Sequence, residues 1–315
     1  MIRYQQIDAL RGLAALAVVI CHFRHGFAPE LIPTLKLLGN LGVFLFFVIS
    51  GYIIPRILAS SHYQIDRLGV FLWRRLLRLH PPFLAALGIS LAATLVAAQV
   101  KGTSVPWSLL SILQYVFYLD FPAENPVVWT LQVEMCFYVF IGLTFPLIND
   151  RRPVVRWGAF LAIAAMGFAG GLLLFLKFLG FFLVGISLEQ YERKAVSAFE
   201  TLVKLGFSLG LCAMNTDILG ASTALLALAV INLGEALRWP RWVLYLGTIS
   251  YSLYLLHFPI GVKLLNWGFA RFTEIPRIGM VATVFTCTVV IATLFYRWVE
   301  KPSMRFAALR GALAS

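Results

Sequence analysis

The chain has 315 residues, of which 60% are hydrophobic and 13% are charged, and it carries a formal net charge of +12. Because roughly a quarter of the residues in a soluble globular domain are charged, this composition excludes an ordinary soluble domain and predicts an integral membrane protein. The apolar runs are continuous rather than alternating. We therefore expect spanning helices and not a β-barrel, since only these two structures satisfy the backbone in lipid.

Ten apolar segments have about the 20-residue length that a helix needs to cross a bilayer. They run near residues 8–28, 38–58, 80–99, 129–148, 156–175, 177–190, 202–215, 219–236, 244–266 and 278–299. With the N-terminus inside, 19 Lys and Arg fall on the inner side and seven on the outer, which together make the 26 of the chain. This bias predicts an all-α integral membrane bundle of about ten transmembrane helices with both termini cytoplasmic. It also explains the positive charge without a nucleic-acid partner.

Arg11 and His22 are titratable residues that lie among the apolar residues of the first segment. Their spacing of eleven residues is three turns plus about 20°, so both side chains lie on one helix face, ~16 Å apart along the axis. An ionisable group in hydrocarbon is costly and usually faces a protein interior or a watery cavity. The pair predicts a polar stripe that reaches from the inner surface into the outer half of the bilayer. The structural alternative is an interfacial Arg and a hydrogen-bonded core His.

A basic cluster precedes the third segment, at Arg74, Arg75 and Arg78, here called the arginine patch. On a helix, residues three and four apart are neighbours, so the three side chains form one cationic surface. Guanidinium groups bind phosphate bidentately, which makes the patch a candidate phosphate site. The alternative is charge that only orients the chain and contacts anionic lipid.

The fourth segment places an acid at depth, because Glu134 lies ~7 Å below the outer end of its helix. His22 has a similar expected depth, so the two could form a base and its orienting carboxylate. A purely structural Glu–Arg or Glu–His pair is the alternative. No metal site is expected, because the closely spaced His22 and His25 have no carboxylate beside them.

Two other segments contribute candidates for lining a substrate cavity. Ser50 lies in the second segment, among glycines that we expect to pack helices together. In the ninth segment Ser250, Tyr254 and His257 follow an i, i+4, i+7 pattern, which gives one polar face. Tyr254 and His257 are therefore cavity candidates, while a hydrogen-bonded core role for His257 is equally open.

Taken together, these segments resemble acyltransferase family 3, a family of bacterial and eukaryotic membrane O-acyltransferases. The resemblance covers nearly the whole chain and rests on six motifs in order. They are Arg11-x10-His22, Ser50-Gly51-Tyr52, Arg74-Arg75-x-x-Arg78, Trp129-Thr130-Leu131-x-x-Glu134-x-x-Phe137-Tyr138, Ser250-Tyr251-Ser252-Leu253-Tyr254-Leu255-Leu256-His257-x-Pro259 and Tyr296-Arg297-x-x-Glu300-Lys301-Pro302.

The resemblance implies transfer of an acyl group, usually acetyl, from cytoplasmic acyl-CoA to a sugar hydroxyl of a surface glycan or lipid-linked glycan precursor. Combined with the residue chemistry, it gives one mechanism. The arginine patch holds the phosphates of acyl-CoA, the donor substrate, and Arg11 lines the donor channel. Neutral His22 deprotonates the acceptor hydroxyl, and Glu134 orients or charges the imidazole. An acyl-histidine intermediate remains open.

Many bacterial members of that family carry a fused extracytoplasmic esterase-like domain. We expect residues 1–315 to form a single membrane acyltransferase domain without a fused soluble domain. Either this domain completes the transfer or a separate extracytoplasmic transferase partner does. The expected location is the cell membrane, specifically a bacterial inner membrane.

Two functions of other classes remain open from the sequence. The first is a multi-pass transporter that exports a glycan precursor or small metabolite, with His22 and Glu134 as a proton relay. The second is a purely structural membrane protein.

Overall fold

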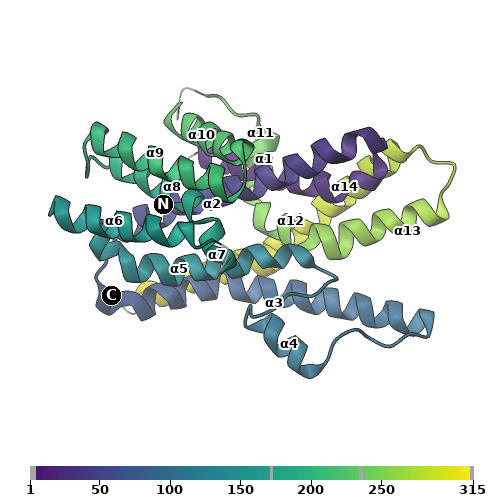
Figure 1. Cartoon of the computed structure of the whole chain (residues 1–315). Helices are drawn as coiled ribbons and strands as arrows, with labels where there is room; N and C mark the ends of the chain where they lie inside the picture. Colours follow the sequence, from purple (N-terminus) through teal and green to yellow (C-terminus); the bar gives the residue numbers. More distant parts are fainter. Residues whose placement is uncertain (1–4, 171–172, 234–236, 313–315) are drawn as a thin grey trace. The chain divides into compact units, whose positions relative to one another are not determined.

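The computed structural model describes residues 5–170, 173–233 and 237–312, and within these ranges every regular element is helical (Figure 1). The chain divides into two compact units. Unit 1 comprises Met1–Ala14, Asn40–Leu72 and Val133–Gly247, and unit 2 comprises Ala15–Gly39, Trp73–Gln132 and Thr248–Ser315. Each unit holds its own set of packed helices.

The ten apolar segments predicted from the sequence are helical over most of their described length. Residues 171–172 of the fifth segment and 234–236 of the eighth lie outside the described residues. In chain order the helices are α1 (Gln5–His22), α2 (Ile32–Ser60), α3 (Leu68–Lys101), α4 (Leu109–Val116), α5 (Trp129–Ile148), α6 (Pro153–Phe168), α7 (Leu174–Lys177), α8 (Leu179–Glu192), α9 (Ala198–Asn215), α10 (Ile218–Leu233), α11 (Arg241–Thr248), α12 (Ser250–Leu256), α13 (Lys263–Arg271), α14 (Arg277–Phe295) and α15 (Lys301–Ala312). Two π-helical turns, η6 (His257–Val262) and η7 (Tyr296–Glu300), join α12 to α13 and α14 to α15.

Among the described residues, four helical stretches are long and apolar enough to cross a membrane: Pro29–Ser60, Ile65–Val100, Pro126–Ile148 and Arg277–Ala308. A fifth is added if Arg241–Thr248 and Ser250–Arg271, which meet at a bend of 64°, count as one span. Helices α6 and α10 are apolar but have 16 residues each. The protein is therefore an all-helical membrane protein over the part that the structure describes.

Several helix boundaries differ from the prediction, and two of them lie near the candidate site residues His22 and Arg78. The first segment was expected to run to residue 28, but α1 ends at His22 and a 3₁₀ turn, η1 (Arg24–Gly26), follows. The chain turns where Gly26 lies against Val281 and Phe269, with no room for a side chain. The third segment was expected to begin near residue 80. Instead α3 begins at Leu68 and holds Pro81 and Pro82 in its interior.

The core of unit 1 is built from aromatic rings and close backbone contacts. Phe137 of α5 stacks on Phe182 of α8, with ring centroids 4.0 Å apart. Helices α8, α9 and α10 pack against one another, and α6 packs on α9 (Figure 1). The backbones of α2 and α8 meet at Gly51 and Gly185, where a Cβ on either residue would collide with the other helix. The predicted packing role of the glycines in the second segment is confirmed at Gly51.

One end of unit 1 is held by paired charges. Arg156 of α6 donates two hydrogen bonds of 2.8 Å to the Glu200 carboxylate of α9. Lys204 lies 2.7 Å from the same carboxylate and donates to Gln190 of α8 at 3.0 Å. Arg56 of α2 likewise pairs with Glu192 of α8, 2.7 Å apart. Buried charges such as Arg156, Glu200 and Lys204 persist only when they are paired and hydrogen-bonded, while the Arg56–Glu192 pair is half-buried. Both groups of charges tie helices together.

Prolines inside the helices leave backbone carbonyls that side chains then satisfy. Proline removes the hydrogen bond to the carbonyl four residues earlier. In unit 1, Pro146 frees the Gly142 carbonyl, which accepts a hydrogen bond of 2.8 Å from the Tyr63 hydroxyl. In unit 2, Pro81 frees the Leu77 carbonyl, which accepts from the Ser303 hydroxyl at 2.6 Å. Without such donors, each carbonyl would stay unsatisfied in an apolar environment.

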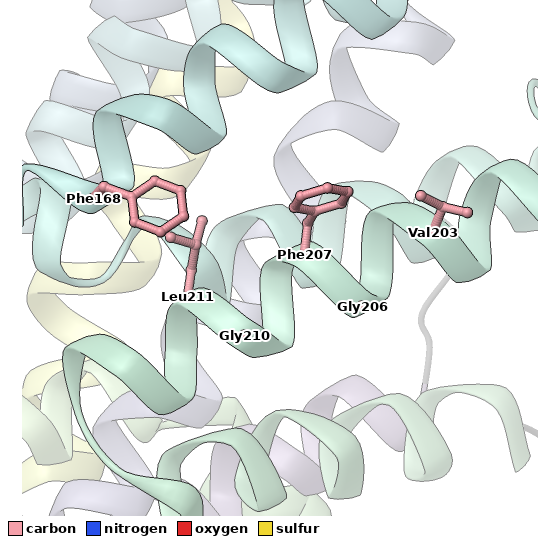
Figure 2. Close-up of a pocket in the computed structure, with 6 residues that line it drawn as sticks. All are labelled: Phe168, Val203, Gly206, Phe207, Gly210 and Leu211. Carbon is pink, nitrogen blue, oxygen red and sulfur yellow. The ribbon is translucent and has the colours of Figure 1, made fainter.

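An open apolar groove of about 460 Å³ runs along α9 in unit 1 (Figure 2). Its floor is formed by Gly206 and Gly210, where an added Cβ would meet nothing within 4 Å. The lining residues are Phe168, Val203, Gly206, Phe207, Gly210 and Leu211. None of these residues has a polar side chain, so the groove offers no side chain that could act in catalysis.

We predict opposite effects for two glycine-to-alanine substitutions. Gly185→Ala drives a methyl group into the α2 backbone and should lower stability by about 1–3 kcal/mol, the usual cost of overpacking. Gly206→Ala places its methyl group in open space and should raise stability by about 0.5–1 kcal/mol, because alanine favours helix. Thermal unfolding of the detergent-solubilised protein measures both. Equal Tm values for the two variants would contradict the close α2–α8 approach.

We also predict that the effect of Tyr63→Phe depends on Pro146. Burial, and then Asp66, raise the pKa of the Tyr63 hydroxyl, which keeps it a donor. Its loss leaves the Gly142 carbonyl unsatisfied and should cost about 1–3 kcal/mol. In a Pro146→Ala background the restored N–H takes that carbonyl, so Tyr63→Phe should cost at least about 1 kcal/mol less. A double-mutant cycle on Tm measures the difference, and strict additivity would refute the explanation.

Candidate functional site

The candidate site in unit 2 begins where α1 ends. His22 is the last residue of α1 and is half-buried, and its neighbour Phe23 is almost fully buried. The His22 ring folds back on its own helix, with Nδ1 2.8 Å from the Val18 carbonyl oxygen. The imidazole therefore lies at the C-terminal end of α1 and not in mid-helix. As the sequence predicts, a single helix carries both Arg11 and His22.

A second imidazole reaches the same place from the ninth predicted segment. The chain bends between α11 and α12, so α12 starts a new helix whose first N–H groups need acceptors. Glu300 supplies one, because its Oε2 accepts hydrogen bonds from both the backbone N–H and the hydroxyl of Ser252. A carboxylate at a helix N-terminus is favourable also because of the helix dipole. Glu300 therefore anchors the helix that leads to His257.

The π-helical turn η6 presents His257 to His22. Pro259 supplies no N–H to the preceding turn, and two carbonyls of that turn accept side-chain donors instead. His257 Nδ1 lies 2.7 Å from the Tyr254 carbonyl oxygen, and Asn125 Nδ2 lies 3.3 Å from the Leu255 carbonyl oxygen. His257 is completely buried.

The two imidazoles are in direct contact. His257 Nε2 lies 3.2 Å from His22 Nδ1, and the ring centroids are 5.0 Å apart. The edge of Phe258 closes on the His22 ring, with centroids 5.4 Å apart. These contacts fix the plane of the His22 ring. The other ring nitrogen, Nε2, has no hydrogen-bond partner among the residues that the structure describes.

A polar layer lies behind His257. The Tyr254 ring lies next to the His257 ring, with centroids 5.6 Å apart. Its hydroxyl donates to the Val127 carbonyl oxygen at 2.9 Å, and lies 2.8 Å from the Thr130 hydroxyl. Asn125 is almost fully buried, and its Oδ1 has no donor within hydrogen-bond distance. Thr130 and Asn125 were not among the predicted candidates, because nothing in their local sequence signals which distant carbonyl or hydroxyl they meet.

The arginine patch lies on α3, in unit 2. Arg75 is buried, while Arg74 and Arg78 are half-buried. Ser303 donates to the carbonyl oxygens of Leu77 and Arg78, and Tyr251 donates to that of Leu79 at 2.8 Å. These bonds hold the proline-containing turn of α3 against α15 and α12, so the patch is attached to a rigid part of the unit.

The other predicted site residues lie in unit 1. Ser50 of α2 donates a hydrogen bond of 2.8 Å to Glu134 Oε1 of α5. Arg11 is half-buried on α1. Next to it, Gly12 brings α1 so close to α11 that a Cβ would collide with the Val243 carbonyl oxygen. The structure thus brings together Ser50 with Glu134 in unit 1, and His22 with His257 and Tyr254 in unit 2.

No group of three or more His, Cys, Asp or Glu side chains with metal-binding geometry is found among residues 5–170, 173–233 and 237–312. In these ranges the imidazoles of His22 and His257 contact each other, and their Nδ1 atoms contact backbone carbonyls.

Comparison with known proteins identifies the class. The profile of a family described as an acyltransferase domain matches residues 4–297, nearly the whole chain. The chain therefore belongs to acyltransferase family 3, and it carries an acyltransferase domain. The matched region includes His22, His257, Glu134 and the arginine patch, whereas Glu300 and Ser303 lie just beyond it. No solved structure matches the chain.

Three curated relatives cover most of the chain. O-acetyltransferase OatA of Staphylococcus aureus is 25% identical over an alignment of 352 positions, which covers 94% of this chain and 56% of the relative. Acyltransferase MdmB of Streptomyces mycarofaciens is 26% identical, over 100% of this chain and 95% of the relative. The putative membrane-bound transacylase BcsY of Komagataeibacter xylinus is 28% identical, over 96% and 84%. The chain thus spans about half the length of OatA and most of the length of the other two.

Proposed function

We propose that this protein is a membrane O-acyltransferase. It moves an acyl group, specifically acetyl, from cytoplasmic acyl-CoA to a hydroxyl of a cell-surface glycan or a lipid-linked glycan precursor. The observation that carries the proposal is the family match across residues 4–297. The name of the OatA relative, an O-acetyltransferase, supports acetyl as the group and oxygen as the acceptor atom.

The geometry of His22 supports its role as the general base. A base must present a ring nitrogen with a free lone pair to the acceptor hydroxyl. Nδ1 of His22 is already engaged by Val18 and His257, which leaves Nε2 for substrate. In the proposed step, Nε2 takes the hydroxyl proton while the oxygen attacks the thioester carbonyl carbon. The C–S bond then breaks, and the CoA sulfur leaves as a thiol with the proton that His22 returns.

The arginine patch is the proposed site for the phosphates of acyl-CoA. Its three guanidinium groups lie within two turns of α3, and their spacing suits several phosphate oxygens. Arg11 and Glu134 remain in the proposal as catalytic residues on sequence grounds. Arg11 would offset negative charge on the donor, and Glu134 would support the charge that His22 gains. Ser50, bonded to Glu134, would hold that carboxylate in place.

We further propose that residues 1–315 act as one membrane acyltransferase domain with about ten transmembrane helices and both termini in the cytoplasm. The four or five helices able to span a membrane support a multi-pass arrangement. The strong positive-inside bias of the sequence supports the orientation. The location would be the cell membrane, specifically a bacterial inner membrane, with an outer-surface glycan as partner. A separate extracytoplasmic transferase would complete the transfer if the acetylated product of this domain is an intermediate.

The first test is replacement of the base. His22→Ala should lower transfer of label from radiolabelled acetyl-CoA to the envelope fraction by about 10²–10⁴-fold, the usual contribution of a general base. His25→Ala, three residues away on the exposed turn, is the matched control and should retain activity. Full transfer by a normally inserted His22→Ala variant would refute the catalytic assignment. A transporter or a structural protein would release no CoA in either variant or in the wild type.

The second test concerns the donor. Arg78→Gln should raise the KM for acetyl-CoA about tenfold, the effect of losing about 1.4 kcal/mol of charged hydrogen bonding to phosphate. The rate at saturating donor should change less, because the patch binds donor and transition state alike. Arg241→Gln, an exposed cation on α11, is the control for general surface charge. If the Arg74→Gln and Arg78→Gln variants both keep the wild-type KM for acetyl-CoA, the arginine patch does not bind the donor.

A further inference from the structure

We propose that His257 is a positioning residue that, together with the Val18 carbonyl, holds His22 in the tautomer whose Nε2 acts as the base. This inference rests on the proposed acyltransferase function. It assigns His257 a role different from the substrate-cavity lining that its sequence position predicts.

The first proton is located on His22. A carbonyl oxygen can only accept a hydrogen bond, and Val18 O lies 2.8 Å from His22 Nδ1. Nδ1 must therefore carry the hydrogen. In a neutral imidazole only one nitrogen is protonated, so Nε2 of His22 has the free lone pair. The base nitrogen is thus the one without a hydrogen-bond partner among the described residues.

The second proton is located on His257 by the same reasoning. Its Nδ1 lies 2.7 Å from the Tyr254 carbonyl oxygen and 3.3 Å from that of Leu253, so Nδ1 carries the hydrogen. Nε2 of His257 is then an acceptor, and the atom it faces at 3.2 Å is the Nδ1–H of His22. Both assignments agree, because a donor meets an acceptor. The opposite tautomer of either ring would place two donors or two lone pairs face to face.

The environment makes this arrangement the stable one. His257 is fully buried, on the π-helical turn that Pro259 interrupts. Its two backbone acceptors lie on α12, whose N-terminus Glu300 anchors through Ser252. The ring cannot turn over without leaving its Nδ1–H unsatisfied in an apolar interior, which is unfavourable. The π-helical turn η6 therefore holds the acceptor atom, His257 Nε2, in a fixed position beside His22.

The same contact has a larger effect during the reaction than before it. When His22 Nε2 takes the acceptor proton, the ring becomes an imidazolium and its Nδ1–H becomes a charge-assisted donor. Such bonds are roughly twice as strong as neutral ones. His257 Nε2 and Val18 O accept that bond, so they stabilise the charged state more than the neutral one. This differential stabilisation increases the rate and leaves donor binding unchanged.

The test compares two unbranched substitutions of similar size at residue 257. His257→Gln places an amide oxygen where Nε2 now lies and keeps an acceptor for His22. His257→Met fills similar space without a comparable acceptor. We expect His257→Met to lower the rate of CoA release at saturating acetyl-CoA by about 10- to 100-fold, with KM for acetyl-CoA within about twofold. His257→Gln should recover most of that rate, which a merely structural role would not predict.

The wild-type protein offers a direct readout. With ¹⁵N-labelled histidine and the protein reconstituted in lipid bilayers, NMR distinguishes the two ring nitrogens of His22, and the His22→Ala variant assigns their signals. We expect the Nδ1–H tautomer in the wild type and a larger share of the Nε2–H tautomer in His257→Met, which keeps the Val18 acceptor but loses that of His257. An Nε2–H tautomer in the wild type, or equal rates for the Met and Gln variants, would overturn the inference.

The outcomes also separate this inference from the proposed function. If His22→Ala keeps full activity, the proposed base is wrong, whatever His257 does. If His22→Ala is inactive while His257→Met has the wild-type rate and tautomer, the base stands and only the role of His257 is refuted.

Discussion

Backbone carbonyls without an N–H partner are the constraint on which much of this structure depends. A soluble protein can leave such a carbonyl to water, but a helix in lipid cannot. Proline appears inside α2, α3 and α5 and in the η6 turn, and each proline removes one donor. The carbonyls at Gly142, Leu77 and Leu255 are each satisfied by a side chain from another element. Each of these bonds joins segments far apart in the sequence.

This requirement for donors also explains how the candidate site is built. In the helical turn before Pro259, the Tyr254 carbonyl contacts His257 and the Leu255 carbonyl accepts a hydrogen bond from Asn125. The irregular turn therefore also orients the His257 imidazole. The interrupted turn of α3 is held by Ser303 and carries the arginine patch. In both cases the irregular backbone lies next to the residues proposed to do the chemistry. Local irregularity thus places functional groups where a regular helix would point them elsewhere.

The sequence predicted the helices well because a hydrophobic run of this length in a membrane can satisfy its backbone hydrogen bonds in few structures other than a helix. Their ends were harder to predict. The third segment was predicted to begin near residue 80, yet α3 begins at Leu68 and holds Pro81 and Pro82 in its interior. The donor to the carbonyl that Pro81 frees is Ser303, more than 200 residues away. His22 was predicted to lie within a longer helix, yet α1 ends there because the next turn packs Gly26 against Val281. Both differences arise from tertiary contacts that no local pattern contains.

By itself, the sequence determined the all-helical membrane class, the presence of Arg11, His22 and Glu134 among apolar residues, and the family to which the chain belongs. These follow from the composition, from the spacing of the residues along helices and from the order of the motifs, all of which can be read from the sequence without the fold. Only the tertiary structure decided which groups meet. It joined Ser50 to Glu134 and His22 to His257. The reason is physical: a hydrogen bond depends on the distance and direction between two atoms, and sequence separation fixes neither once the chain has folded.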